Sequence, residues 1–145
     1  MFVVLIDYRL SGVATRRITQ LLAYAVGDGS DHKLSHILHS MYSGAPAKLY
    51  VWIEDDREAV GLIGWRVPGG SLEILHIAVD EGKRHQGIGR RLIDAAVALE
   101  RPHEVLAETD HDAVEFYQHY GFSIQSLGEK YPGVESFQCR WQSGT

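Results

Sequence analysis

The stretch from Ser71 to Leu99, SLEILHIAVDEGKRHQGIGRRLIDAAVAL, decides our interpretation of the fold. It contains an apolar strand, a charged turn, two glycines at positions 87 and 89, and an amphipathic helix from about Gln86 to Leu99. Glycine lets the backbone approach a ligand closely, and the first N–H groups of a helix lie unpaired at the positive end of its dipole. The stretch therefore predicts a site for an anionic ligand.

The bulk composition predicts one soluble globular domain over residues 1–145. With 45% hydrophobic and 23% charged residues the chain is neither disordered nor membrane-spanning, and a net charge of -5 argues against general nucleic-acid binding. The first ten residues are apolar but carry Asp7 and Arg9 without a basic start, so we expect a strand, no signal peptide and a cytoplasmic protein. The single Cys139 alternates with Phe137 and Trp141, which predicts a buried, unreactive thiol.

The pattern of apolar residues and turn signals predicts an α/β (α+β) fold. We expect a central mixed sheet of about seven strands, flanked by about four helices. The expected strands cover residues 2–8, 48–54, 59–67, 71–79, 104–108, 122–127 and 136–141, and the expected helices cover 16–26, 31–42, about 86–99 and a segment between Asp110 and Gly121. The short links at 55–57 and 68–70 predict an antiparallel meander, whereas the helix between the fourth and fifth strands makes those two parallel.

Several local signals complete this prediction. Thr15 and Asp110 are candidate caps of the first and last helices, Asp31 opens the second helix, and Gly27-Asp28-Gly29 stops the first. The segment 128–133 is expected as a loop long enough to contribute to a site.

The glycine-rich turn does not fit two well-known phosphate-binding motifs. A dinucleotide fingerprint requires glycine where this chain has Leu92, and a P-loop requires Ser or Thr where Gly82-Lys83 is followed by Arg84. The simpler interpretation is that the glycines only shape a tight connection between strand and helix. The nearby basic side chains favour a phosphate site instead; they are Lys83, Arg84, Arg90 and Arg91.

Residues 84–89, RHQGIG, resemble the Arg/Gln-x-x-Gly-x-Gly/Ala signature of the GNAT superfamily of acetyl-CoA-dependent N-acetyltransferases. Residues 77–80, IAVD, resemble the end of that family's fourth strand. Residues 110–122, DHDAVEFYQHYGF, resemble its Asn-x-x-Ala-x-x-Phe-Tyr-x-x-x-Gly-Phe pattern. Two motifs in the right order with a strand between them are far more specific than either alone, and the resemblance covers about residues 71–122.

The resemblance implies a site for acetyl-CoA as co-substrate, with no metal. In similar proteins the main-chain N–H groups of the signature turn hold the pyrophosphate of coenzyme A, and the pantetheine arm pairs with the fourth strand. The cofactor-binding residues that it implies are Ile77, Ala78, Val79, Arg84, His85, Gln86, Gly87, Ile88, Gly89, Arg90, Asp110 and Tyr117. Asp110 departs from the usual Asn, which keeps an acceptor but adds a charge, so it either contacts the cofactor or only caps its helix.

Acetyl transfer to an amine requires a base and an acid. Because an alkylammonium group has a pKa of about 10.4, a base must remove a proton, and Glu73 matches the strand position where some GNAT enzymes keep a basic Glu. The alternatives are that Glu73 is a rim carboxylate, or that His76, expected on the opposite face, takes its place. Tyr117 falls on the family's tyrosine position and is the expected acid for the leaving thiolate; its alternative role is packing. A backbone N–H near Ile77 is expected to meet the oxyanion.

The acceptor is predicted only as a small-molecule or protein amine. His32, His36 and His39 share one helix face, for which we prefer a polar surface, or a wall of the acceptor pocket, over a metal site. The carboxylates expected either to attract a cationic amine or simply to be solvated are Glu54, Asp55, Asp56, Glu108, Glu129 and Glu135.

Two other functions remain: an acyl-CoA-binding regulatory or assembly protein without turnover, and a phosphate-binding module unrelated to coenzyme A. The resemblance also makes a homodimer one expected assembly.

Overall fold

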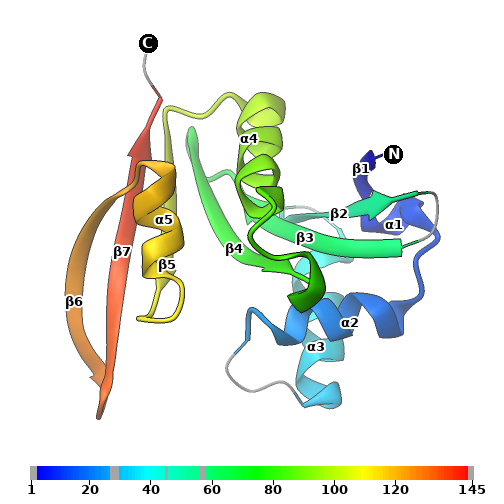
Figure 1. Ribbon diagram of the computed structural model, residues 1–145, viewed down its shortest axis with the longest axis horizontal. Helices are drawn as coiled ribbons and strands as arrows, with labels where there is room; N and C mark the ends of the chain where they lie inside the picture. The colour runs from blue at the N-terminus through cyan, green and yellow to red at the C-terminus, as the bar shows by residue number, and fades with distance from the viewer. Residues whose placement is uncertain (1–2, 27–29, 45, 56–57, 144–145) are drawn as a thin grey trace. The chain divides into compact units, whose positions relative to one another are not determined.

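The computed structural model describes residues 3–26, 30–44, 46–55 and 58–143. Within these residues the elements along the chain (Figure 1) are β1 (Val3–Asp7), α1 (Tyr8–Ser11), α2 (Thr15–Ala23), α3 (Asp31–Tyr42), β2 (Lys48–Glu54), β3 (Glu58–Arg66), β4 (Ser71–Val79), the 3₁₀ turn η1 (Glu81–Lys83), α4 (Ile88–Glu100), β5 (Glu104–Thr109), α5 (Val114–Tyr120), β6 (Ser123–Tyr131) and β7 (Val134–Gln142).

The strands of the described chain form one seven-stranded sheet in the order β1-β2-β3-β4-β5-β7-β6. β4 and β5 are parallel, with Glu73 opposite Leu106 in the register, because α4 carries the chain from one strand to the next. The predicted mixed sheet with parallel fourth and fifth strands is therefore confirmed. By contacts the chain divides into two compact units, one of residues 1–66 and 75–96 and the other of residues 67–74 and 97–145, so that β4 contributes to both.

The first unit is built on the antiparallel strands β1, β2 and β3. α2 and α3 supply the apolar side chains of its core at helical spacing, and the strands supply the rest. The buried members of this core include Ile18, Leu21, Leu22, Leu34, Leu38, Tyr42, Leu49, Val51, Leu62 and Ala78. The same unit contains the end of β4, η1 and the start of α4.

α4 begins at Ile88, two residues later than predicted. Ile93 belongs to its buried face, whereas Leu99, the last residue of the predicted helix, is 54% exposed. Ile88 and Leu92 pack closely over β3 at Gly61, where an added Cβ would lie 3.5 Å from each of them. The absence of a side chain at Gly61 thus lets α4 approach the strand.

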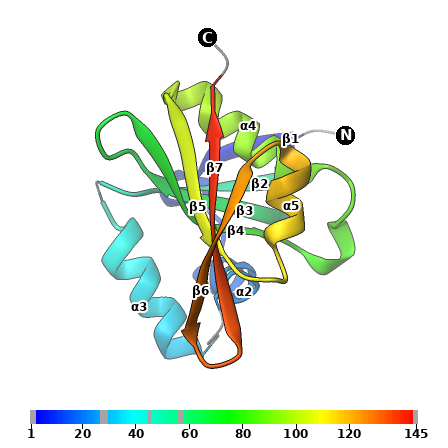
Figure 2. The same cartoon turned by 90° about the vertical axis from the view of Figure 1, so that its left-hand side faces the viewer.

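The second unit contains β5, β7 and β6, with β7 in the middle and antiparallel to both neighbours (Figure 2). Cys139 on β7 lies opposite Ala107 and Ile124 and is fully buried, which confirms the predicted packing role. α5 contributes Tyr117, which is 4% exposed. Burial raises the pKa of the Cys139 thiol to about 11, so the thiol stays protonated.

Two helix starts differ from the prediction. Thr15 is the first residue of α2 and does not cap it, since the cap position belongs to Ala14. An additional short helix, α1, follows β1 directly, and the carboxylate of Asp7 caps it by accepting the N–H of Arg9.

The predicted stop at Gly27-Asp28-Gly29, and the part of the 55–57 link beyond Asp55, lie outside the described residues. Within the described chain, no helix combines the length and apolar character needed to cross a bilayer.

The predicted loop at 128–133 is wrong. β6 continues to Tyr131 and β7 begins at Val134, so that only Pro132 and Gly133 connect the two strands. Gly133 has φ +80°, as a tight turn with proline before glycine requires. Two register shifts in β6, at 126–128 and 129–131, let this polar, glycine-containing segment stay paired as a strand.

Candidate active site

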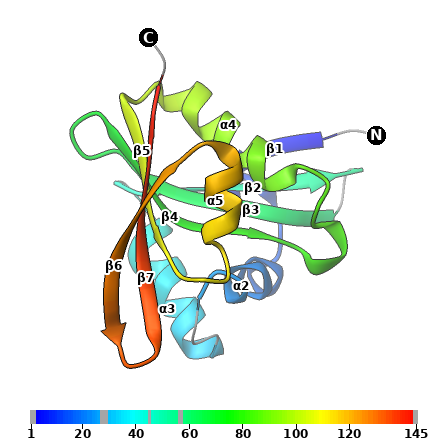
Figure 3. The same cartoon turned by 60° about the vertical axis from the view of Figure 1, so that its left-hand side comes forward.

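The turn between β4 and α4 (Figure 3) contains residues with the left-handed backbone conformation expected of an anion site. His85 and Gly87 both have positive φ, +63° and +82°, and the N–H of Arg91 donates to the carbonyl of Gly87 at 3.1 Å, which begins the hydrogen bonds of α4. The N–H groups of Gly87, Ile88 and Gly89 thus precede the first hydrogen bond of the helix. Chain neighbours aside, no described heavy atom lies within 4 Å of a Cβ placed on Gly87, so the space over this glycine is open.

Asp80 fixes the start of this turn. Its N–H donates to the carbonyl of Val60 at 2.8 Å, and its own carbonyl accepts the N–H of Lys83 at 2.9 Å. Its side-chain Oδ1 accepts the N–H of Gly82 at 2.9 Å. The turn is thus anchored to β3 before its backbone reaches the two residues with positive φ.

The basic side chains of the turn have protein partners. Lys83 Nζ lies 3.2 Å from Oε1 of Glu54, whose other carboxylate oxygen accepts the indole N–H of Trp52 at 3.3 Å. Arg84 Nε donates to the carbonyl of Val79 at 3.0 Å. Arg90, in the first turn of α4, is exposed.

The acidic residues expected to attract an amine do not form a set of free surface carboxylates. Glu54 is only 6% exposed, so the expectation is wrong for this residue. Glu108 pairs with Lys130 at 2.9 Å, and Glu135 with His111 at 3.2 Å. Asp56 lies outside the described residues.

The predicted pantetheine-pairing residues are the last three of β4. Ala78 is buried, while Ile77 and Val79 are half-buried. Both these residues and the turn at 84–90 belong to the first unit, where the bond from Arg84 to Val79 joins them directly. The structure therefore brings this part of the predicted cofactor site together.

The other predicted site residues belong to the second unit. Glu73 is half-buried near the start of β4. Tyr117 packs edge to face against Phe116 and Phe122, with ring centroids 5.1 Å apart in each pair, and burial raises the pKa of its phenol. A phenol with a raised pKa keeps its proton throughout the neutral range, which a proton donor requires.

Asp110 does not cap α5 as the sequence suggests. Ala113 occupies the cap position, and the carboxylate of Asp110 accepts the N–H of Asp112 at 2.9 Å in the preceding turn. Its carbonyl accepts the N–H of Val114 at 3.1 Å. The side chain thus stabilises the turn that leads into the helix.

His76 has a partner that local sequence reasoning missed. The hydroxyl of Tyr42, at the end of α3, lies 2.6 Å from its Nδ1. Burial lowers the pKa of His76, so the imidazole stays neutral near physiological pH. The two residues lie 34 positions apart in the chain, so no local sequence pattern relates them.

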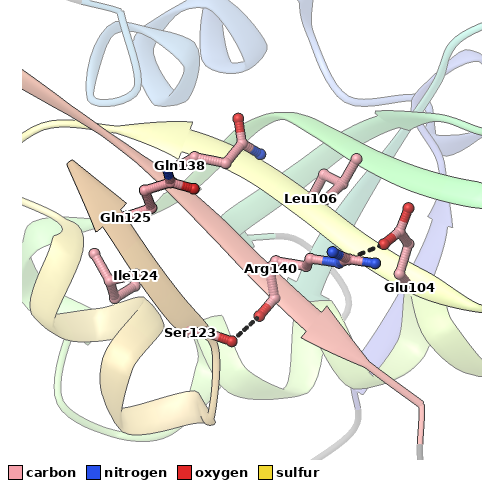
Figure 4. Close-up of a pocket in the computed structure, with 7 residues that line it drawn as sticks. All are labelled: Glu104, Leu106, Ser123, Ile124, Gln125, Gln138 and Arg140. Atoms are coloured by element: carbon pink, nitrogen blue, oxygen red, sulfur yellow. Dashed lines mark hydrogen bonds and ion pairs between the residues drawn. The ribbon is translucent and has the colours of Figure 1, made fainter. Parts of the chain in front are cut away.

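A shallow depression lies on one face of the second unit (Figure 4) and contains none of the predicted site residues. Its two charged groups neutralise each other, because Arg140 Nε donates to Glu104 Oε1 at 2.7 Å. The depression is lined by Glu104, Leu106, Ser123, Ile124, Gln125, Gln138 and Arg140. It therefore offers no unbalanced charge for an ionic ligand.

The histidine face of α3 is a polar surface, as predicted. His32, His36 and His39 are all exposed. Among the described residues no group of three or more His, Cys, Asp or Glu side chains is arranged to hold a metal ion.

Comparison with known proteins decides the family. Residues 46–124, more than half of the chain, match the family model described as acetyltransferase (GNAT) domain. The chain belongs to the GNAT acetyltransferase family. The matched region includes both the signature turn at 84–89 and the motif that ends at Phe122, the two features on which the sequence resemblance rests.

A relative that is described as an N-acetyltransferase supports the assignment. An "uncharacterized N-acetyltransferase in lysA 3'region" of Bacillus methanolicus is 32% identical over 76 residues, which are 52% of this chain and 62% of that protein. This match thus spans less than two thirds of the relative's length.

Solved structures of the family share the fold. Ard1 from Thermoplasma volcanium has a TM-score of 0.73 at 21% identity and covers 100% of both chains. A GNAT acetyltransferase from Elizabethkingia anophelis with acetyl-CoA bound has a TM-score of 0.70 at 19% identity and covers 97% of this chain and 98% of that one.

Proposed function

We propose that the protein transfers an acetyl group from acetyl-CoA to a primary amine by direct attack in a ternary complex. The observation that carries the proposal is the turn after β4, where positive φ at His85 and Gly87 and open space over the glycine present backbone N–H groups to a ligand. A GNAT relative of the same fold binds acetyl-CoA. The charge of a pyrophosphate suits these donors.

The residues proposed to hold coenzyme A follow from this turn. The N–H groups of residues 84–89 bind the pyrophosphate, and Arg90 adds positive charge at its exposed position. The end of β4, with Ile77, Ala78 and Val79, binds the pantetheine arm. Arg84 is held on the Val79 carbonyl in the structure, so its guanidinium would have to leave that carbonyl to reach a phosphate.

Glu73 and Tyr117 are the proposed proton-transfer groups. Glu73 accepts a proton from the acceptor ammonium, directly or through water, and the free amine then attacks the thioester carbonyl. Collapse of the tetrahedral intermediate breaks the C–S bond and expels the thiolate, which takes the Tyr117 proton. The nitrogen gives up its second proton, through water, to the Tyr117 phenolate, so that the neutral amide, free coenzyme A and the phenol result. Because burial raises the pKa of Tyr117, the phenol is protonated when the thiolate forms, but the same shift makes it a weaker proton donor. The proposed role therefore rests on the place of Tyr117 in the family motif.

A second function, binding of an acyl-CoA without turnover, is favoured by one observation. Tyr117 is 4% exposed and packed between two aromatic rings, an environment that a purely structural tyrosine would share. Release of free coenzyme A in the presence of an amine separates the two functions.

The test measures thiol release from acetyl-CoA across polyamines, aminoglycosides, amino acids and peptide amines. We expect release with at least one class, and a loss of about 100-fold or more in kcat in Tyr117→Phe with cofactor binding retained. Binding without release for every amine would instead favour the second function.

Gly87→Val tests the cofactor site itself. We expect this variant to lose acetyl-CoA binding, because a side chain there meets an unfavourable φ and fills the open space. Gly69→Val is the matched control, since Gly69 also has positive φ, +62°, and open space around it, but lies in the β3–β4 turn. Equal losses in both variants would refute the proposed site.

A further inference from the structure

α2 contacts the turn after β4 at two positions. Arg17 Nη2 lies 2.7 Å from Oδ2 of Asp80, and the ring of Tyr24 lies 4.8 Å from the guanidinium carbon of Arg84. Tyr24 follows α2 directly at its C-cap and lies seven residues after Arg17, so two helical turns place the two residues on the same side. One side of this helix thus holds both the first and the fifth residue of the turn.

Arg17 binds more than one partner. Its Nε donates to the carbonyl of Ala59 at 2.9 Å, while Nη2 donates to Asp80 and Nη1 lies 3.5 Å from Oε1 of Gln20. The guanidinium therefore ties β3 and the end of β4 to α2 through separate nitrogen atoms. The planar guanidinium group has several N–H donors at fixed angles, so it can bind these partners at the same time. The ammonium group of lysine cannot reproduce this geometry.

Asp80 connects Arg17 to the backbone of the turn. One carboxylate oxygen accepts from Arg17, and the other accepts the N–H of Gly82 in η1. The hydrogen bond from Arg17 is the main cause that holds the pKa of Asp80 below its usual value, so the carboxylate stays ionised. Arg17 and Asp80 thereby fix the turn at its first residues.

Tyr24 contacts the turn further along, at Arg84. Arg84 lies over its ring while donating to the carbonyl of Val79, so the backbone just before His85 is held on both sides. His85 and Gly87 follow with positive φ, a conformation that is unfavourable for His85 without support from its surroundings.

We propose that Arg17 and Tyr24 are positioning residues that preorganise the turn 80–89 for coenzyme A. The inference rests on the proposed function. A turn that is already held in its binding conformation loses less conformational entropy when coenzyme A binds. If only a fraction of the molecules has that conformation, the affinity is reduced to the same fraction. α2 therefore sets the affinity for acetyl-CoA without touching it.

The experiment compares Arg17→Gln, Asp80→Asn, their double variant and Tyr24→Leu with the wild type. Calorimetry gives the Kd for acetyl-CoA, thermal unfolding gives the stability, and hydrogen exchange of the peptide 80–91 is measured without ligand. Arg16→Gln is the control for charge, since Arg16 is the exposed neighbour of Arg17 on the same helix.

We expect the Kd to rise about fivefold in Arg17→Gln and in Asp80→Asn, as loss of a partly exposed ion pair allows. The double variant should lose less than the sum of the two single losses, because both single variants remove the contact between Arg17 and Asp80. Tyr24→Leu should raise the Kd about threefold. Exchange should increase in the turn in each of these variants, Arg17→Lys should restore only part of the affinity, and Arg16→Gln should match the wild type.

Unchanged Kd and unchanged exchange in the turn of Arg17→Gln would overturn the inference while leaving the proposed function intact. Fully additive losses in the double variant would also overturn it, as would equal weakening by Arg16→Gln. If the wild type itself fails to bind acetyl-CoA, the proposed function fails and this inference fails with it. Faster exchange in the turn would then describe only a structural contact.

Discussion

The hydroxyl of Tyr42 lies 2.6 Å from Nδ1 of His76 and joins the end of α3 to β4 within the first unit. Tyr42 is 1% exposed, and burial raises the pKa of its phenol while burial also lowers the pKa of the imidazole. Both groups are therefore neutral, and the tautomer of the His76 ring decides which of them donates. Protonation of His76 would place a charge in this buried pair.

The first prediction concerns the pH dependence of stability. The folded-state pKa of His76 lies below the ordinary value of 6.5, so as the pH falls below that value the unfolded chain takes up a proton before the folded one does. Stability is then lost progressively down to the folded-state pKa. Thermal unfolding between about pH 7.5 and pH 5.5 should show this loss, and His76→Gln should reduce its slope.

The control for this titration is His36→Gln, which changes an exposed histidine of α3. We expect its pH profile to follow that of the wild type. An unaltered slope in His76→Gln would show that the pair does not contribute to the acid sensitivity.

The second prediction concerns the space that Tyr42 occupies. A Cβ on Gly64 of β3 would overlap the Tyr42 hydroxyl and its ring carbons, so Gly64→Ala must displace a fully buried side chain. We expect a loss of about 1–3 kcal/mol in the free energy of unfolding, measured by urea denaturation. Gly44→Ala is the control, because a Cβ there meets no described heavy atom within 4 Å, chain neighbours aside. Equal stability of the two variants would contradict the packing described.

The contacts of Tyr42 with His76 and Gly64 show which features of the structure cannot be predicted from the sequence alone, and the strands beside them show which can. Local patterns predict β2 and β4 to the residue, since alternating or continuous apolar runs there end at clear turn signals. The turn at 84–89 is also a local feature, because its glycines and basic residues are adjacent. Contacts such as Tyr42 with His76, or Arg17 with Asp80, join residues 34 and 63 positions apart and leave no local trace.

The extra length of β6 and β7 escaped prediction for a different reason. Residues 128–131 contain glycine and charged side chains, which are typical of a loop, and they contribute almost no burial. Their strand conformation depends on pairing with β7 and on the two register shifts between the strands. It is therefore determined by the partner strand as well as by the segment itself.

The third prediction concerns the thiol of Cys139. A side chain with 0% exposure and a pKa of about 11 should not react with an aromatic disulfide reagent at about pH 8, whereas the same reagent should titrate one thiol in denaturant. Absorbance of the released thiolate measures both. Rapid reaction of the folded protein would contradict the buried placement, and its absence makes the reagent suitable for following coenzyme A release.

The fourth prediction compares two ion pairs. Lys83→Met leaves the buried Glu54 side chain without its ammonium partner, so we expect a loss of about 1–2 kcal/mol in the free energy of unfolding. Lys130→Met breaks a pair in which both side chains are about half exposed, and we expect a loss below about 0.5 kcal/mol. Urea denaturation of both variants gives the comparison. A larger loss in Lys130→Met would reverse the ranking that burial predicts.

The division of the chain has a consequence for biosynthesis. The first unit combines residues 1–66 with 75–96, and the second combines 67–74 with 97–145, so each is made of two separate lengths of chain. The first unit is incomplete until the ribosome has passed residue 96, and the second needs the last strand, β7. A deletion from the carboxyl end that removes β7 should therefore affect a unit that also includes residues 67–74 in the middle of the chain, because β5 and β6 lose the strand that pairs with both of them.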